Sequence, residues 1–326
     1  MVAQDSVLVM LVKLVDRIPV LAPPPHRRGH PRVYSDRLFL KALVIMIVRH
    51  LAHVHELLSV LAEPTAEMQT LRALLAEQGR FPCRRTFERR LAALPATLPA
   101  QIGCLGRYLV TVLDLWQAAA RAAAIDSTVL RAKGGVWHKK DRAAGVVPHT
   151  SIDTEAGWTK SGWHGWVYGW KLHVACAVGT VWLPLAAALT PAPEADNTVA
   201  PALIHELPLD LRYLLGDQHY RDPDLDALCA LRNCQLIVPR GGPYPHTDAG
   251  VDVRRLLHKT RSLTMENFNE QFKGIFDAHQ QVPTRGLVAT QRFALGALFV
   301  YQLSLLHRHQ QGADLRVGLK AFLKAA

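Results

Sequence analysis

The sequence is short of features that would place it in several simple classes of protein. Its cysteines number only five, and no two of them form a Cys-x-x-Cys pair. An odd number of thiols at wide spacing argues against a disulfide framework and against a zinc knuckle, and it predicts reduced thiols in a cytosolic compartment. The five are Cys83, Cys104, Cys176, Cys229 and Cys234.

The chain also lacks an uninterrupted apolar run that could cross a membrane. Residues 38–61 are apolar, but Lys41, Arg49 and Glu56 interrupt them at positions that would be costly in lipid. The first 20 residues are apolar too, yet charged residues break them and no signal-peptide core or cleavage site follows. We therefore expect a buried helix within 38–61, no membrane span and a cytoplasmic protein.

The sequence has fewer acidic than basic residues. Lys plus Arg number 38 against 27 for Asp plus Glu, which gives a net charge of +11 and a pI near 9.7. This balance favours a polyanionic partner such as DNA or RNA. The alternative is a basic soluble protein without any role on nucleic acid. With 49% apolar residues, the 326-residue chain can bury a substantial core in one large domain or two medium ones.

The N-terminal third predicts helices almost throughout. Residues 70–77 and 84–91 form a helix-turn-helix pattern around a glycine- and proline-containing turn, and the second helix carries four arginines. Such a helix can lie in a major groove, where arginines meet phosphates or guanine edges. The alternative is a solvated arginine-rich face in a helical packing domain. The four are Arg84, Arg85, Arg89 and Arg90.

From residue 120 onward the pattern changes to strands alternating with helices. Apolar runs rich in β-branched residues predict the strands, and Gly179-Thr180 predicts a hairpin turn. The tryptophan- and glycine-rich segment 149–169 predicts a loop, and proline-rich stretches at 23–31 and 241–245 predict breaks. This order indicates a mixed sheet with helices on its faces. We expect strands at 122–129, 170–178, 181–189, 212–216 and 234–239, and helices at 198–206, 222–231, 261–278 and 289–307.

Three carboxylates stand where separate elements can present them to one site. Asp126 and Asp217 each follow an apolar run that predicts a buried strand, and Glu266 lies on a predicted helix with Lys273 two turns on. Three such acids can hold two divalent ions about 3.5–4 Å apart, which is the standard apparatus for in-line phosphoryl displacement. Their order along the chain matches the ribonuclease H-like arrangement of a two-metal nuclease, so we expect an α/β fold of that kind.

Glu266 and Glu270 compete for the third acid, because residues four apart share one helix face. Glu266 has Lys273 seven residues on, where a cation can reach a phosphate, whereas Glu270 has Asp277 at that spacing. This difference favours Glu266 and leaves Glu270 as a solvated or supporting acid.

Several neighbouring residues have two interpretations. Lys273 and Arg261 can bind DNA phosphates, or they can be solvated helix residues. His219 can orient a ligand, although a turn histidine is the simpler interpretation. Asp196 can approach the metals, but N-capping of the helix that follows explains it sufficiently.

Three tryptophans in the segment 149–169 also have two interpretations. They are accompanied by Lys160 and His164 and can stack on an unpaired DNA base, where stacking is worth roughly 1–3 kcal/mol per base. A hydrophobic lid over the core is the alternative that we favour. The three are Trp158, Trp163 and Trp166.

These motifs together resemble the DDE transposases of bacterial insertion sequences, in the group that includes the insertion-sequence-4-like and -5-like enzymes. The resemblance runs from about Tyr34 to the C-terminus. It departs from that pattern in one place, because Arg261 stands five residues before Glu266 where the family has four, and His258 is near the expected tyrosine. The motifs that carry it are Asp126-Ser-Thr, Trp166-Val-Tyr-Gly-Trp-Lys-Leu-His173, Leu214-Leu-Gly-Asp-Gln-His-Tyr-Arg-Asp222 and Met265-Glu-Asn-Phe-Asn-Glu-Gln-Phe-Lys273.

The resemblance implies a transposase that binds the terminal inverted repeats of its element, cuts both ends and joins the 3′ hydroxyls to target DNA. It implies two Mg²⁺ or Mn²⁺ ions on Asp126, Asp217 and Glu266, double-stranded DNA as partner, a homodimer on DNA and a place in the bacterial cytoplasm at the nucleoid. We expect a helical DNA-binding region at 1–115, a ribonuclease H-like catalytic domain at 116–310 and a tail at 311–326. Two alternatives are an inactive or domesticated transposase-derived DNA-binding protein and a nuclease of the same fold.

Overall fold

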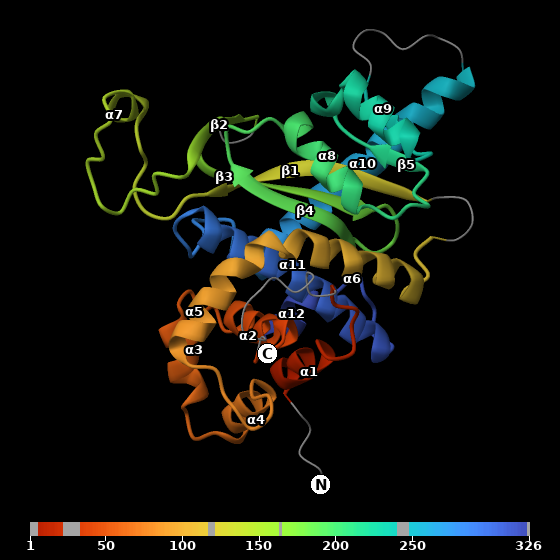
Figure 1. The fold of residues 1–326 in the computed structure, drawn as a ribbon. Helices are drawn as coiled ribbons and strands as arrows, with labels where there is room; N and C mark the ends of the chain where they lie inside the picture. The colour runs from red at the N-terminus through yellow and green to blue at the C-terminus, as the bar shows by residue number, and fades with distance from the viewer. Residues whose placement is uncertain (1–5, 22–32, 117–120, 163–164, 240–247, 325–326) are drawn as a thin grey trace.

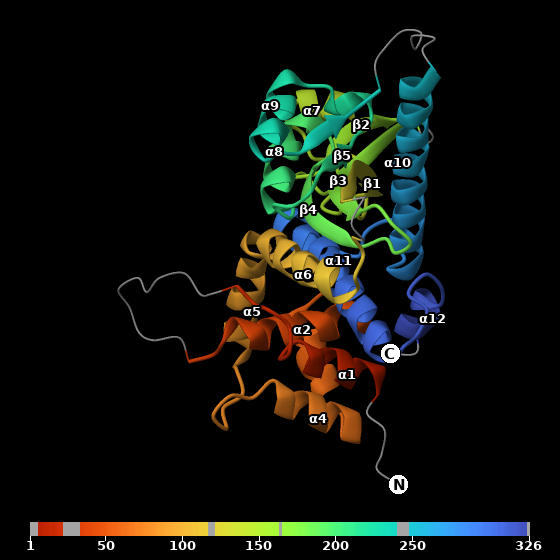
Figure 2. The ribbon, with the colours of Figure 1, turned by 90° about the vertical axis from the view of Figure 1, so that its right-hand side faces the viewer.

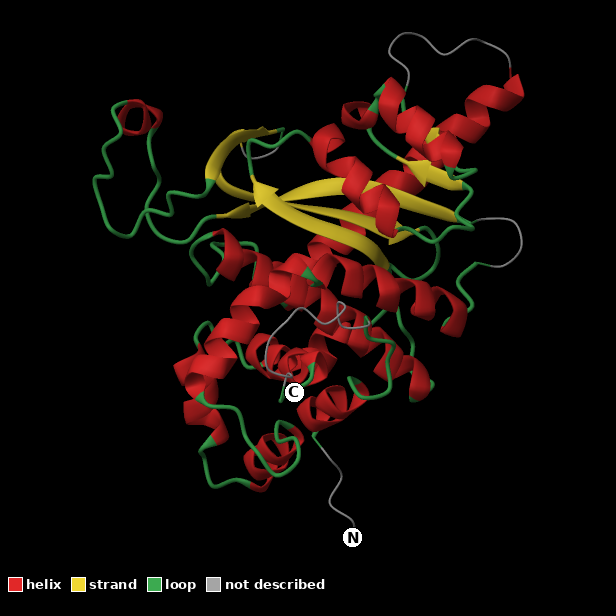
Figure 3. Ribbon diagram, in the orientation of Figure 1, coloured by secondary structure: helices red, strands yellow, loops and turns green. Residues whose placement is uncertain are grey.

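The computed structural model describes residues 6–21, 33–116, 121–162, 165–239 and 248–324, and in the last range it describes the side chains from residue 255 onward. Trp163, His164 and the proline-rich stretches at 23–31 and 241–245 lie outside these ranges. A lower half built only of helices carries an upper half that contains every described strand (Figure 3).

The elements follow the predicted order closely. The helices are α1 (Val7–Leu14), α2 (Asp36–Val48), α3 (Val54–Leu61), α4 (Ala66–Leu74), α5 (Arg84–Ala93), α6 (Leu98–Val112), α7 (Lys139–Ala143), α8 (Asp196–Glu206), α9 (Pro223–Leu231), α10 (Asp248–Ile275), α11 (Leu287–Gln310) and α12 (Leu319–Lys324). The strands are β1 (Ala122–Arg131), β2 (Gly157–Ser161), β3 (Gly165–Ala177), β4 (Pro184–Pro191), β5 (Tyr213–Leu215) and β6 (Gln235–Ile237). Two short 3-10 helices are η1 (Leu94–Ala96) and η2 (Gln218–Tyr220).

Local sequence accounts for where these elements begin and what they bury. Ser35 caps α2 by accepting a hydrogen bond from the backbone N–H of Leu38 at 3.3 Å, as expected for a Ser at that position. The α10 side chains Phe268, Phe272 and Ile275 recur at helical spacing and are all buried. The apolar run at 122–125 is likewise fully buried in β1.

The sheet has the ribonuclease H-like arrangement that the sequence predicts. Its strand order is β4-β3-β1-β5-β6, with β2 paired to the N-terminal half of β3. β1, β3 and β4 run antiparallel to one another in turn, whereas β5 and β6 are parallel to β1. The sheet is therefore mixed and carries helices on its faces, which confirms the predicted fold class.

The expectation of a loop throughout 149–169 is wrong for its second half. Residues 157–161 form β2, and β3 already begins at Gly165 and pairs with it antiparallel. Gly169 does not form a turn. It allows the backbones of β3 and β1 to approach closely, because a Cβ at this position would meet the Leu130 carbonyl oxygen at 2.0 Å. A glycine-rich composition alone does not distinguish these two uses.

Two helices also differ from their predicted bounds. α10 begins at Asp248, thirteen residues before the predicted start at Arg261. Its first half, which extends past the sheet (Figure 1), was not predicted because it lacks the regular apolar stripe that marks a packed helix. In α8, the N-cap is Ala195 and Asp196 is the first helical residue, so the predicted capping role of Asp196 is wrong.

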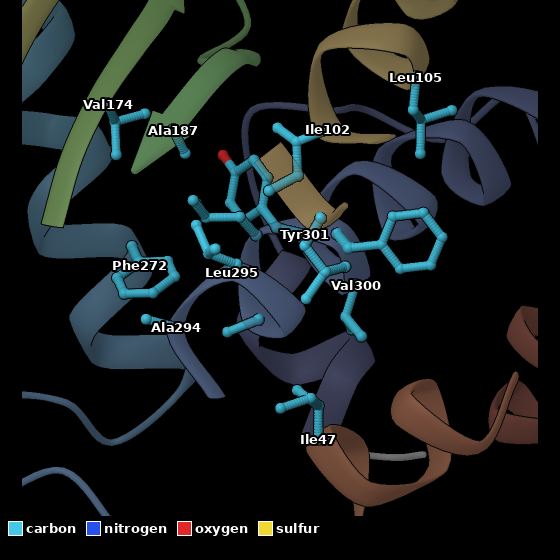
Figure 4. Close-up of a cluster of buried hydrophobic side chains, with 14 of the residues drawn as sticks. Ile47, Ile102, Leu105, Val174, Ala187, Phe272, Ala294, Leu295, Val300 and Tyr301 are labelled. Atoms are coloured by element: carbon cyan, nitrogen blue, oxygen red, sulfur yellow. The ribbon is translucent and has the colours of Figure 1, made fainter. Parts of the chain in front are cut away.

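The sheet lies between α8 and α9 on one side and α10 on the other, while α6 and α11 run beneath it (Figures 1 and 2). Tyr301 and Leu295 of α11, Ile102 of α6, and Val174 and Ala187 of the sheet meet in one buried cluster (Figure 4). This core is continuous with the buried side chains of α1 and α2. The domain boundaries at 115 and 310 stay predictions, because one hydrophobic core joins both sides of them.

The longest helices carry too many charges or polar residues for a bilayer. Within the described ranges, no helix is both long and apolar enough to span a membrane.

Candidate active site

Two aspartates lie side by side on the central strands. β1 and β5 pair in parallel up to Ala124 opposite Leu215, and Asp126 and Asp217 each stand two residues past that pair. Equal spacing from a matched pair on neighbouring parallel strands places both residues at the same level along the strand direction. Asp126 lies within β1, which continues to Arg131, and Asp217 lies just past the end of β5. The sequence predicted each strand separately, and the sheet brings the two acids together.

Asp126 is held against Arg261 of α10. Its Oδ2 lies 3.3 Å from the guanidinium Nη1, and its Oδ1 accepts a hydrogen bond from the Ser127 backbone N–H at 2.8 Å. Burial nevertheless raises the pKa of Asp126 to about 6, against the lowering effect of Arg261 and with further raising by the charges of Asp217 and Asp196. The side chain keeps 23% of its surface exposed, so a cation has access to it.

Tyr220 reports on the same group of charges. It is 1% exposed, and burial raises the pKa of its hydroxyl well above the usual range, with the negative charges of Asp196, Asp126 and Asp217 adding to the effect. The charges of all three aspartates therefore act on one buried phenol. Of these, Asp217 also accepts hydrogen bonds from His219, at 2.8 Å from its backbone N–H and 3.0 Å between Oδ2 and the ring Nδ1.

His219 lies in the short 3-10 helix η2, in keeping with a turn histidine. Its hydrogen bond to Asp217 raises its pKa above the usual value, because it favours the protonated ring. Whether it orients the Asp217 carboxylate for a ligand stays a prediction.

Asp196 belongs to a second, adjoining network that the sequence did not predict. Its Oδ1 lies 3.2 Å from Lys171 Nζ and 3.4 Å from His173 Nδ1. The His173 ring is fully buried, with Nε2 at 2.9 Å from the Thr190 hydroxyl, and burial lowers its pKa to about 4. A histidine and a lysine within the apolar strand β3 were the available signal, since polar residues in a buried strand need partners.

The third predicted acid does not join the two aspartates. Glu266 is exposed on α10, and Glu270 is exposed as well, with its Oε1 at 3.4 Å from His279. Across the residues that the structure describes, no three Asp, Glu, His or Cys side chains come close enough to hold a metal ion as a group. The choice between Glu266 and Glu270 stays a prediction.

The two aspartates supply carboxylate oxygens of the kind that bind a hard divalent cation, but only two of the three acids that the sequence predicts. Carboxylate oxygens are the ligands that Mg²⁺ and Mn²⁺ take, and open coordination positions suit water and phosphate. The raised pKa of Asp126 shows a carboxylate whose charge the protein compensates only partly, which a bound cation would correct.

Lys273 lies further along α10, away from Arg261. Burial lowers its pKa, Glu270 opposes that effect and Arg131 at the end of β1 adds to it. Two cations from α10 and β1 therefore stand close together there, with Glu270 beside them.

Two of the four arginines of α5 form ion pairs within the protein, and the other two are exposed to solvent. Arg90 pairs with Asp36 and places its guanidinium over the Phe39 ring at 4.4 Å, which ties α5 to α2. Arg84 pairs with Glu88 at 2.7 Å along the same helix. Arg85 and Arg89 are exposed.

The tryptophans of the segment 149–169 also divide. Trp158 packs against Tyr168 with ring centroids 5.4 Å apart and donates a hydrogen bond to the Trp137 carbonyl at 2.8 Å, as a covering residue would. Trp166 is 56% exposed, and Lys139 Nζ lies 3.7 Å from its ring centroid.

The fold is a ribonuclease H-like mixed sheet, with Asp126 on its central strand and Asp217 just past the neighbouring parallel strand. The chain belongs to the transposase DDE domain family, whose model matches residues 117–303. A search of curated proteins found no match. Among solved structures, the chain is similar to a piggyBac transposase, taken from a cryo-EM structure of its synaptic complex with hairpin DNA. That similarity has a TM-score of 0.41 and 10% sequence identity, and it covers 97% of this chain and 76% of the other.

Proposed function

We propose that this protein cuts DNA at the two ends of a mobile element and joins the freed 3′ hydroxyls to target DNA. The observation that carries the proposal is the matched placement of Asp126 and Asp217 on neighbouring parallel strands, with Arg261 at 3.3 Å from Asp126. Membership in the DDE transposase family and the excess of positive charge support the same conclusion.

In this proposal Asp126 and Asp217 hold two Mg²⁺ or Mn²⁺ ions together with Glu266. When bound, such ions polarise the scissile phosphate and lower the pKa of water or of a 3′ hydroxyl. His219 keeps the Asp217 carboxylate oriented, and the network of Asp196, Lys171 and His173 supports the same edge of the sheet from the other side.

We further propose how the DNA is held. Arg261 and Lys273 contact phosphates near the cut, and the arginines of α5 bind the terminal inverted repeats. The region 1–115 is the part that recognises DNA, 116–310 is the catalytic part, and two copies assemble on a pair of ends, because transposition brings two ends together.

The test is a cleavage and joining assay on a supercoiled plasmid that carries both element ends, with Mg²⁺ or Mn²⁺. We expect metal-dependent nicking and joined products for the natural protein. Both Asp126→Asn and Asp217→Asn should reduce them to background, whereas Asp226→Asn, an exposed acid on α9, should not. Nicking without joining would indicate a nuclease, and DNA binding without nicking would indicate a DNA-binding protein.

The third acid is tested in the same assay with a matched pair of variants. Glu266→Gln should abolish nicking and Glu270→Gln should retain it, because only Glu266 has a lysine, Lys273, seven residues on. The two variants are matched, since both substitutions are isosteric and both side chains are exposed on α10. The reverse result would assign the third ligand to Glu270.

A further inference from the structure

A cavity of about 340 Å³ lies at the far end of β1 from Asp126, between three parts of the chain that are distant in sequence. It is bounded by the turn between α2 and α3, by the segment that follows β1 and by the connection from α10 to α11. Its lining includes Lys133, Arg285, Arg292 and His53, and no carboxylate is among the lining residues.

The three permanent cations of the cavity are oriented by backbone carbonyls. Lys133 Nζ donates to the Pro283 carbonyl at 2.7 Å, Arg292 Nη2 donates to the Ala52 carbonyl at 3.1 Å, and Arg285 Nη1 donates to the Thr150 carbonyl. None of the three forms an ion pair with a carboxylate in the described part of the chain. A guanidinium has five N–H donors and a lysine has three, so each keeps most of its donors for an anion.

The nearest carboxylates are engaged elsewhere. Glu56 accepts the backbone N–H groups of Ala52 and His53, each at 2.8 Å. Asp153 and Glu155 accept the first N–H groups of the α11 region, at 2.8 and 2.7 Å. These acids lie outside the lining of the cavity, and in the described part of the chain none of them forms an ion pair with its cations.

The rim of the cavity is rigid. Gly134 exchanges two hydrogen bonds with the side chain of Gln281, at 3.0 and 3.1 Å. Its φ is +86°, and a Cβ there would meet the Ser151 carbonyl oxygen at 2.2 Å, so only glycine fits where the two limbs of the α7 loop come together. Figure 1 shows this loop projecting from the body beyond that point. Cations on a fixed rim lose little entropy when they bind.

We infer that this cavity binds a backbone phosphate of the DNA that enters the active site, some distance from the bond that is cut. Lys133 stands seven residues after Asp126 and two past the end of β1, so at about 3.3 Å per residue the two lie at most about 23 Å apart. At about 3.4 Å per base pair, the bound phosphate lies within about seven base pairs of the cut. The inference rests on the proposed function and adds a contact shared by the helical half and the catalytic half.

Arg292 supports a ligand that carries negative charge. Burial lowers the pKa of this guanidinium, so its charge is poorly solvated before any ligand arrives. A phosphate oxygen would restore both a counter-charge and hydrogen-bond acceptors, which a neutral or apolar ligand would not.

The experiment measures binding of a fluorescent 40-base-pair duplex carrying one element end, by anisotropy in EDTA. Neutral methylphosphonates replace single phosphates one position at a time. We expect a loss of about tenfold at one position within about seven base pairs of the cut, as for a charge-assisted hydrogen bond. In Lys133→Gln/Arg285→Gln the same substitution should have no further effect, and the slope of log affinity against log salt should fall by about one to two.

The matched control is Arg212→Gln/Arg232→Gln, which removes the same charge at the start of β5 and the end of α9. Arg232 is likewise held by one backbone carbonyl, that of Leu207 at 2.7 Å. Because Arg292 is partly buried, Arg292→Lys serves as a second variant that keeps the charge and the fold; it should weaken binding at the same phosphate only.

The outcomes separate the two proposals. If the cavity variant and the control weaken binding equally, or if the methylphosphonate effect survives in the variant, the cavity proposal is overturned while DNA binding stands. If the natural protein is stabilised by inorganic phosphate through these residues but not by DNA, the site serves a free anion and the cavity proposal is also wrong. If no DNA is bound at all, the proposed function itself fails and this contact fails with it.

Discussion

At the scale of single residues, an acid and a base of the candidate site have pKa values shifted from their ordinary range. Asp126 favours its neutral form because it is buried, and His173 favours its neutral form for the same reason. Burial penalises whichever form is charged, so the two groups affect stability with opposite signs as pH changes.

The first prediction concerns Asp126→Asn without divalent ions. The folded pKa of about 6 exceeds the reference value of 3.8, so the group stabilises the fold fully below pH 3.8 and loses that contribution as pH rises through 6. At 1.36 kcal/mol per pKa unit the loss is at most about 3 kcal/mol, since part of the side chain stays exposed. The variant should therefore melt at a higher temperature than the natural protein at pH 8, and the gain should vanish near pH 4.

Calorimetry with and without Mg²⁺ completes that test. The natural protein should gain stability from Mg²⁺ and Asp126→Asn should not, with Asp226→Asn as the surface control. A variant that is less stable than the natural protein at pH 8 would contradict the account of Asp126.

The second prediction concerns His173→Gln. The folded pKa of about 4 lies below 6.5, so the neutral ring contributes stability that is complete above pH 6.5 and is lost as pH falls towards 4. The natural protein should lose unfolding free energy across this window more steeply than the variant, whatever their absolute stabilities. Urea unfolding at pH 7.5, 6 and 5 measures the difference, and parallel curves would rule the explanation out.

At the scale of elements, α5 combines two tasks that its sequence does not separate. Four arginines within seven residues predict a single basic face, yet Arg90 points inward to Asp36 and Phe39 while Arg85 and Arg89 face solvent. A helix turns by 100° per residue, so nearby arginines cannot all share one environment.

The third prediction separates those tasks. Arg85→Gln/Arg89→Gln should weaken DNA binding about tenfold or more and leave the melting temperature unchanged, because these side chains make phosphate contacts in the proposal. Arg90→Gln should instead lower the unfolding free energy by about 1 kcal/mol, since it removes the ion pair with Asp36 and the contact with the Phe39 ring. Anisotropy and calorimetry on both variants provide the measurement. Equal loss of stability in the two would show that α5 is only a packing helix.

At the scale of the whole molecule, α11 joins the helical half to the sheet. It is buried along most of its length and contacts α1, α2, α6 and β4. Gln302 at its centre is fully buried, and its side-chain amide donates to the Ile102 carbonyl of α6 at 2.9 Å and to the Pro184 carbonyl of β4 at 2.8 Å. One side chain thus bonds three elements inside an apolar layer.

The fourth prediction is that Gln302→Ala lowers the unfolding free energy by about 2–4 kcal/mol. It removes two buried hydrogen bonds, to the Ile102 and Pro184 carbonyls, and opens a void in the same place. Gln310→Ala, near the exposed end of the same helix, should change it by less than about 0.5 kcal/mol. Both halves should still unfold in one transition, as chemical denaturation followed by tryptophan fluorescence would show, because their core is continuous. Two separate transitions would contradict this.

Much of this protein is determined by its sequence alone. Apolar runs ending in an acid defined β1 and β5, phenylalanines at helical spacing defined the packed half of α10, and the order of these elements defined the mixed sheet. Those signals are local, because burial of one face imposes a period on the residues that cover it. The strand β2 and the first half of α10 were not predicted, since glycines and solvent-facing residues show no hydrophobic periodicity.

Only the tertiary structure decided which polar groups meet. It placed Asp196 against Lys171 and His173 in place of a helix cap, turned Arg90 towards Asp36, and set Lys133, Arg285 and Arg292 around one cavity. Pairing between charges separated by tens or hundreds of residues depends on the packing of several elements at once. No pattern of neighbouring residues encodes that distance, and so the sequence could nominate Asp126 and Asp217 as candidate site residues but could not predict which groups they would contact.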